Sequence, residues 1–126
     1  GVMHRNTYIH SPDLLEATME TRAQKGLFFA GQMTGVEGYV ESAASGIVAA
    51  YSAFARAAGK EPRAFPKETA IGALCHYISH FIGKDFQPMN VNFGLLPPLP
   101  ERVKKREKNG KLAARALSVL DAFIKK

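Results

Sequence analysis

Three glycines and a glutamine lie between an apolar run and a helix-like segment, and this arrangement suits the binding of an anion or a dipole. The apolar run is residues 27–30, and Gly31, Gln32, Gly35 and Gly38 follow it. Glycines let a ligand approach the backbone closely, and the first N–H groups of a helix have no partner inside the helix. A tight turn that is needed only for packing would produce the same spacing.

One cysteine and two histidines are the other candidates for chemistry. A single cysteine, Cys75, allows no internal disulfide, and its place on the apolar face of a predicted helix favours a buried, inert thiol. His76 and His80 are four residues apart on one helix face, as in some metal pairs. No third ligand is evident near them, so we predict no metal site.

The charge of the chain is unevenly distributed. Residues 1–100 hold eight lysines and arginines and eight acidic residues, whereas residues 101–126 hold nine basic and three acidic residues, so the net charge of +6 lies in the last segment. Such a patch suits a polyanion such as RNA, although a solvated helix face has the same composition. The RNA-binding candidates are Arg102, Lys104, Lys105, Arg106, Lys108 and Lys111.

Length and composition describe a globular piece without membrane segments. The chain has 126 residues, of which 46% are hydrophobic, and it contains no apolar run of the length that a membrane span needs. It starts without the apolar core of a signal peptide and without an element before its first loop, as a cut inside a protein would. We therefore expect a cytoplasmic location and no membrane partner.

The glycine-rich segment and two flanking segments resemble one enzyme family. AGQMTGVEGYVESAASG is similar to the C-terminal flavin-binding segment of the folate- and FAD-dependent tRNA (uracil-5-)-methyltransferases, the TrmFO family. MHRNTYIHSP before it and FQPMNVNFGLLPPLP after it also resemble TrmFO segments, in the same order. The related GidA/MnmG family is less similar after AGQ. The resemblance covers nearly the whole chain, but only the last part of such an enzyme.

The resemblance implies roles for named residues. It places Gly31-Gln32 where many FAD proteins have Gly-Asp against the ribityl chain. The amide side chain of Gln32 has a donor and an acceptor for hydroxyl or phosphate groups. The start of the next helix would face the edge of the flavin where negative charge builds on reduction. The implied cofactor-binding residues are Gly31, Gln32, Gly35, Val36, Gly38 and Tyr39. The implied folate-binding residues are His4, which would stack on the pterin, and Arg5 and Asn6.

The resemblance also implies an activity for the intact protein. Such an enzyme methylates C5 of a uridine in the tRNA T-loop with the one-carbon unit of methylenetetrahydrofolate, and FAD reduced by NAD(P)H supplies the electrons. The cysteines that the family uses for methyl transfer lie outside this chain, so we assign no catalytic residue here. There is no G-x-G-x-x-G for the ADP half of FAD. We expect the chain to be inactive without the missing N-terminal region, and its apolar faces to favour self-association.

Two other functions stay open. The chain could be a non-catalytic helical module that binds tRNA through its basic segment. It could also be part of a GidA/MnmG-like protein that modifies the wobble uridine of tRNA, although MTGVEGYVESAASG argues against this.

Apolar spacing and capping residues predict four helices and one short strand. Ser11 as N-cap and Pro12 at the first position begin a helix over residues 12–23. The remaining predicted elements are a buried strand at 27–30, a helix over 39–58 closed by Gly59, a helix over 68–82 capped by Gly83, and a helical segment over 101–126 weakened at Asn109-Gly110. Residues 85–100 form an apolar loop that must lie against another surface.

The predicted fold is mostly α with a few short strands. The resemblance makes it the C-terminal portion of a Rossmann-type FAD-binding α/β domain with a helical tail. Residues 1–59 would then be the last piece of the FAD-binding domain, and residues 60–126 a helical C-terminal region that ends in the basic tail.

Overall fold

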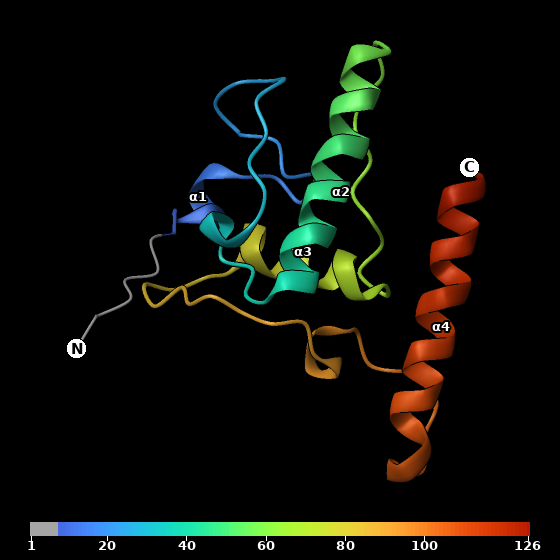
Figure 1. The fold of residues 1–126 in the computed structure, drawn as a ribbon. Coiled ribbons are helices and arrows are strands. Elements are labelled where there is room, and N and C mark those ends of the chain that lie inside the picture. Colours follow the sequence, from blue (N-terminus) through green and yellow to red (C-terminus); the bar gives the residue numbers. More distant parts are fainter. Residues whose placement is uncertain (1–7) are drawn as a thin grey trace.

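The computed structural model describes residues 8–126, and the predicted folate-binding residues His4, Arg5 and Asn6 lie outside this range. Figure 1 shows a mostly helical arrangement. In chain order the elements are α1 (Ser11–Leu14), the 3-10 helix η1 (Gln32–Thr34), α2 (Tyr39–Ala57), α3 (Ala70–His80), the 3-10 helix η2 (Phe93–Leu95) and α4 (Lys105–Lys125). Among these residues no helix combines the length and the apolar composition that crossing a bilayer requires.

The three long helices confirm the prediction from apolar spacing. Helix α2 occupies almost the whole range expected, and Gly59 follows its C-cap with a φ of 75°, the conformation that favours glycine there. Helix α3 is shorter than predicted because Thr69 caps its start, with Oγ1 accepting a hydrogen bond from the N–H of Gly72. Its last residue is His80, so the predicted cap Gly83 lies beyond the helix end.

Helix α4 is continuous through Asn109-Gly110, where the sequence predicts a weakened helix. The side of Gly110 where a Cβ would lie is open space. The cost of two poor helix formers is small, and the packing of Leu112 and Phe123 further along the helix outweighs it.

The predicted helix over residues 12–23 was also wrong. Helix α1 ends at Leu14, and Leu15 is extended, with φ −122° and ψ 144°. The chain then makes a tight hairpin-like turn, in which Leu15 pairs with Thr21 and Met19 adopts a φ of 69°. Both Leu15 and Met19 are fully buried. A tertiary contact therefore overrides the local helix signal in this segment.

Ser11 does not act as the predicted N-cap, because His10 holds that position. Ser11 is fully buried, and its Oγ donates a hydrogen bond to the carbonyl oxygen of Thr34. The serine thus joins α1 to η1 across 23 residues instead of closing its own helix.

No sheet forms among residues 8–126, which corrects the prediction of a strand at 27–30. Only Phe28 of that run pairs, through one isolated bridge to Glu20, and Leu27 is exposed. Two further isolated bridges join Leu15 to Thr21 and Val36 to Met89. Two backbone hydrogen bonds flank the bridge between Phe28 and Glu20, from the N–H of Thr21 to the carbonyl oxygen of Leu27 and from the N–H of Phe29 to that of Met19. A strand needs a neighbour along its length, and this pairing ends after one bridge.

The main core surrounds α3. Its buried members come from both sides of the chain, so the predicted ranges 1–59 and 60–126 share it: Leu15, Met19, Val36, Val48, Leu74, Cys75, Ile78 and Phe86. Phe86, Met89, Val91 and Leu95 of the apolar loop lie on or against this core, as expected for a loop of that composition.

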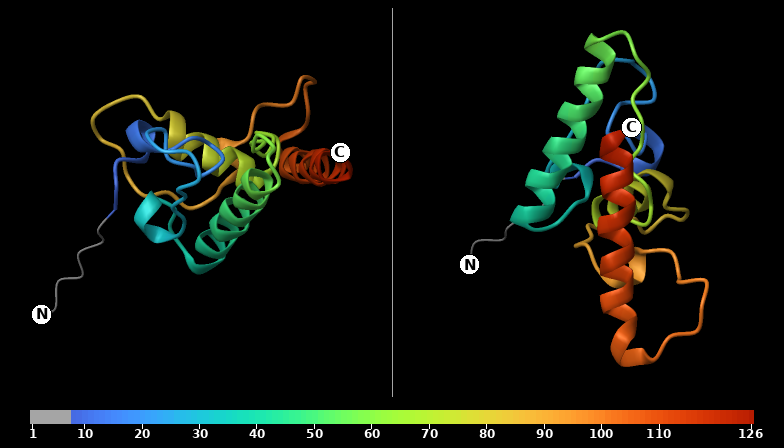
Figure 2. Two further views of the ribbon diagram at one scale, coloured as in Figure 1. Left: turned by 90° about the horizontal axis from the view of Figure 1, so that it is seen from above. Right: turned by 90° about the vertical axis from the view of Figure 1, so that its right-hand side faces the viewer.

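Helix α4 lies along one side of the molecule (Figures 1 and 2). Leu112 packs with Ala73 and Leu96 in a second, smaller cluster. Near its other end, Phe123 meets the rings of Tyr51 and Phe65 at centroid distances of 5.9 and 4.8 Å. The helix is therefore attached at two points by apolar contacts.

A buried ion pair joins the hairpin turn to the end of α2. The side chain of Glu20 is 6% exposed and accepts two hydrogen bonds from the guanidinium of Arg56, of 2.7 and 2.8 Å. It also accepts one from the N–H of Gly26. The hydrogen bonds from Arg56 hold the pKa of Glu20 below its usual value, so the pair is ionised near neutral pH.

Removing the arginine should therefore destabilise the fold. We expect Arg56→Met to lower the free energy of unfolding more than the loss of an exposed pair does, because the carboxylate of Glu20 stays buried without its partner. Lys125→Met is the matched control, since it breaks an exposed pair with Asp121 and should cost about 0.5 kcal/mol or less. Urea unfolding followed by circular dichroism measures both values, and equal losses would contradict the structural role of Arg56.

Candidate functional site

The glycine-rich turn before α2 is an ordered structure with three residues in the left-handed half of conformational space. Gly31, Gly35 and Gly38 have φ values of 84°, 98° and 97°. Between the first two lies η1, whose Thr34 donates from both its N–H and its Oγ1 to the carbonyl oxygen of Gly31. The N–H of Gly31 donates to Oγ of Ser45 in α2 at 2.7 Å. The turn is thus fixed to the helix that it precedes.

The six predicted cofactor-binding residues do not share one environment. Gln32, Gly38 and Tyr39 are exposed, and Tyr39 is 96% exposed, so it is not a core residue in this chain. Gly31 is partly exposed, and a Cβ built on it would meet open space. These four accessible residues lie at the two ends of the turn, Gly31 and Gln32 at the start of η1 and Gly38 and Tyr39 at the start of α2.

Gly35 and Val36 are buried instead. A Cβ on Gly35 would lie 2.6 Å from Cζ of Phe86, so the missing side chain makes room for that ring. Val36 is fully buried in the main core, so neither its side chain nor its main chain is accessible. At these two positions packing explains the residue type fully.

The loop after α3 supports the turn. The N–H of Glu37 donates to the carbonyl oxygen of Met89, and the N–H of Met89 donates to that of Gly35. Asn90 adds hydrogen bonds of 2.8 Å from Nδ2 to the carbonyl oxygen of Glu37 and to Oε2 of Glu41. Asn90 thus ties the loop to the start of α2.

The start of α2 is open. Its N-cap is Gly38, and no side chain within residues 8–126 caps it by a hydrogen bond. The first N–H groups of a helix carry a partial positive charge, so they attract a negative or polar group. A Cβ on Gly38 would lie within 3 Å of the side chains of Glu41 and Asn90, so this close backbone approach also requires glycine.

The predicted RNA-binding residues lie together at the other end of the molecule. All six are exposed, and within residues 8–126 none of them forms an ion pair. Three of the cations, Lys104, Lys105 and Arg106, stand at the N-terminal end of α4, where the helix dipole repels positive charge. An anion bound here would be attracted by both the side chains and the helix end. Arg115 differs from these six residues because its guanidinium donates hydrogen bonds to the carbonyl oxygens of Pro97 and Pro98.

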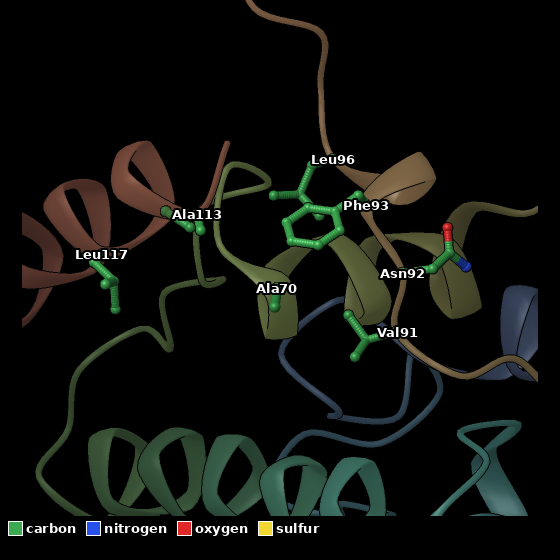
Figure 3. A pocket seen from close by; sticks show the side chains of 8 residues that line it. Ala70, Val91, Asn92, Phe93, Leu96, Ala113 and Leu117 are labelled. Carbon is green, nitrogen blue, oxygen red and sulfur yellow. The ribbon is translucent and has the colours of Figure 1, made fainter. Parts of the chain in front are cut away.

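An apolar cleft of about 580 Å³ separates α4 from α3 and the apolar loop (Figure 3). Asn92 is its one polar lining residue. The labelled side chains come from three parts of the chain, with Ala70 on α3, Val91 to Leu96 on the loop, and Ala113 and Leu117 on α4. The cleft offers shape and apolar surface rather than catalytic groups.

Cys75 and the two histidines show no arrangement for catalysis. Cys75 is 1% exposed, and burial raises the pKa of its thiol to about 12, which confirms the inert thiol. The rings of His76 and His80 stack with centroids 4.2 Å apart. Burial and the neighbouring His80 lower the pKa of His76. Within residues 8–126 no group of three or more histidine, cysteine or acidic residues could hold a metal ion.

Comparison with known proteins gives consistent matches. The chain is 58% identical over all of its length to the methylenetetrahydrofolate–tRNA-(uracil-5-)-methyltransferase TrmFO of Anoxybacillus flavithermus. It is 57% identical over 94% of its length to the TrmFO of Enterococcus faecalis, and 58% identical over 98% to that of Symbiobacterium thermophilum. The chain belongs to the TrmFO family. It spans only 28–29% of the length of these relatives.

Two further matches connect this TrmFO chain with the GidA proteins. Residues 1–61 match the family described as glucose inhibited division protein A. The solved structure of Aquifex aeolicus GidA is similar over 54% of this chain and 11% of that one, at 42% sequence identity and a TM-score of 0.52. The fold of the TrmFO chain is therefore shared in part with GidA.

Sequence reasoning missed the residues that hold the turn of this TrmFO chain in place. Ser45, Phe86 and Met89 each contact it from 10 or more residues away in the sequence. Ser45 is one small residue in a run of small residues, and nothing in its neighbours marks the hydrogen bond to Gly31. Of these three residues, Phe86 has the clearest sequence signal, because a large aromatic side chain in a loop indicates a contact with another part of the chain.

The two kinds of glycine can be separated by substitution. We expect Gly35→Ala to lower the free energy of unfolding by at least about 2 kcal/mol, because the new Cβ combines a positive φ with the clash against Phe86. Gly46→Ala, in the middle of α2 with open space beside it, should instead stabilise the chain by about 0.5–1 kcal/mol. Thermal and urea unfolding test both, and a neutral Gly35→Ala would show that Phe86 does not need this space.

Proposed function

We propose that this chain is the C-terminal, flavin- and folate-facing portion of a TrmFO-type enzyme that methylates C5 of the tRNA T-loop uridine. The observation that carries the proposal is the start of α2, where Tyr39 is exposed and no side chain within residues 8–126 caps the helix, together with exposed Gln32 in the turn before it. The whole-length similarity to TrmFO relatives supports it. Methylenetetrahydrofolate, FAD and NAD(P)H are the proposed cofactors of the intact enzyme.

A role in binding the edge of a flavin explains this turn better than a role in packing alone. Gly31 leaves open space for a ligand to approach the backbone, and Gln32 offers both a donor and an acceptor. When bound, the reduced flavin would supply the electrons that turn the transferred one-carbon unit into a methyl group. The residues of this chain would bind and orient the flavin. Accessible groups would come from Gly31, Gln32, Gly38 and Tyr39. Buried Gly35 and Val36 would act indirectly, by holding the turn in its conformation. Folate binding by His4, Arg5 and Asn6 remains part of the proposal.

The chain should not catalyse the reaction by itself. It spans 28–29% of its relatives, and the other 70% or so would supply the remaining FAD-binding region and the methyl-transfer residues. In this proposal the turn and α2 complete a Rossmann-type FAD-binding domain within residues 1–59, and residues 60–126 add the helical tail. The missing N-terminal region is then an obligatory partner.

A full-length chimera tests the flavin site. In it, this chain replaces the matching segment of the Anoxybacillus flavithermus relative. FAD binding is followed by fluorescence quenching. We expect Gln32→Ala to weaken binding about fivefold, the value of one hydrogen bond, and Gly38→Trp to abolish it. The isolated chain should bind FAD only when the remaining portion is supplied in trans.

Gln24→Ala is the matched control for the glutamine, because Gln24 is equally exposed but lies in the hairpin region away from α2. It should change FAD affinity less than twofold. If Gln32→Ala binds FAD as tightly as the unsubstituted chimera, the assignment of Gln32 is wrong.

The second candidate function, a helical tRNA-binding module, rests on the exposed cations around the start of α4. These residues also serve the first proposal, because a TrmFO-type enzyme acts on tRNA. The two proposals differ in flavin: an enzyme portion binds it in the chimera, and a bare RNA module does not. If the chain has a GidA-like function, the chimera would modify the wobble uridine of the anticodon instead of the T-loop uridine.

Replacing Lys104, Lys105, Lys108 and Lys111 by glutamine should weaken tRNA binding and reduce its salt dependence. If each lysine contacts a phosphate, the slope of log K against log salt concentration should become less steep by about 3. The control replaces four other exposed lysines, Lys25, Lys60, Lys67 and Lys84, and so changes the net charge equally. Equal effects of the two sets would mean that only the total charge matters, and would remove the basic segment as the tRNA site.

A further inference from the structure

Helix α2 is apolar on the side that faces away from the core. Its buried residues are Ser45, Val48 and Ser52, which lie on one face. All of its exposed residues are apolar or aromatic: Tyr39, Val40, Ala43, Ile47, Ala50, Phe54 and Ala57. Val40, Ile47 and Phe54 are 78%, 66% and 76% exposed. Helices with apolar residues on all sides are normally buried on all sides.

The exposed residues repeat with the spacing of a helix-packing seam. Val40, Ala43, Ile47, Ala50, Phe54 and Ala57 follow one another at intervals of three and four residues, and we name them the outer stripe of α2. Large residues at 40, 47 and 54 alternate with alanines at 43, 50 and 57. Such alternation lets a second helix pack closely, with its side chains over the alanines.

With only residues 8–126 considered, every residue of the outer stripe is exposed. Figure 2 shows α2 along the outside of the molecule in both views. Helix α4, in contrast, buries Leu112 and Phe123 and exposes mainly charged residues in its first half, as a surface helix does. The exposed residues of α2 are thus apolar along the whole helix, whereas α4 exposes large apolar side chains only in its second half, at Leu117 and Ile124.

We propose that the outer stripe of α2 packs against an apolar helix in the portion of the full-length TrmFO protein that this chain does not span. This inference rests on the proposal that the chain is a portion of such an enzyme. The length outside the chain identifies the occupant, because relatives that match the whole chain are more than three times longer. A second copy of the chain is the competing occupant.

The inference assigns α2 a double function. Its first residues border the proposed flavin edge, and its outer stripe would join them to the rest of the enzyme. The packing of the outer stripe against the apolar helix would then set the position of Gln32 and Tyr39 relative to the remainder of the flavin site.

Ala50→Glu tests the stripe in two settings. In the isolated chain Ala50 is exposed, so the substitution should change the melting temperature by less than about 2 °C and should reduce the binding of a hydrophobic dye. In the full-length chimera the glutamate would be forced into an apolar interface, and the melting temperature should fall by at least about 5 °C.

Ala114→Glu is the matched control, because Ala114 is an equally exposed alanine inside α4. It should shift the melting temperature by less than about 2 °C in both settings. The inference is overturned if Ala50→Glu leaves the chimera as stable as Ala114→Glu does, or if dye binding to the isolated chain is unchanged. It is also overturned if Ala50→Glu dissociates the chimera from dimer to monomer in sedimentation, since the occupant would then be a second copy.

The outcome is separable from the flavin proposal. A chimera that is sensitive to Ala50→Glu but binds no FAD supports the interface and contradicts the flavin site. A chimera that binds FAD and tolerates Ala50→Glu supports the flavin site and contradicts the interface.

Discussion

Burial of α3 is the constraint on which the rest of this fold depends. Helices α1 and α2 and the 3-10 helix η2 each pack against it, and most of its residues are buried. The described part of the chain has no sheet to share this role. Gly72 shows how tight this packing is, since a Cβ there would overlap the carbonyl group of Pro66. The irregular segments take their shapes from the surface of one short helix.

The helices could be predicted because their signals are local. Period, caps and length identify α2, α3 and α4 without knowledge of what they contact. The hairpin after α1 could not be predicted, since the contacts that hold it are distant in the sequence: Leu15 and Met19 are buried in the main core, and Glu20 pairs with Arg56, 36 residues away. The strand at 27–30 was wrong for a related reason: an apolar run indicates burial, but the length of the pairing depends on the partner, and the hairpin pairs with this run at one bridge only.

The candidate site divides in the same way. Gln32 and Tyr39 are both exposed, so their side chains are accessible. Gly35 and Val36 have the same local signal, but distant contacts with Phe86 and Met89 decide their environment. One glycine motif therefore combines positions that face outward with positions that serve the core, and only the tertiary structure separates them. The exposure of the basic segment was easier to predict, because a run of charged residues lies at the surface whatever the rest of the chain contacts.

The burial of Cys75 gives the chain a built-in reporter of its own unfolding. The only thiol lies in the main core beside Met19, and a thiol reagent reaches it only when that core opens. At neutral pH the raised pKa suppresses the thiolate in the folded chain, whereas an unfolded chain has an ordinary cysteine. The rate of modification at one atom therefore measures how often the packing around α3 comes apart, without any label being introduced.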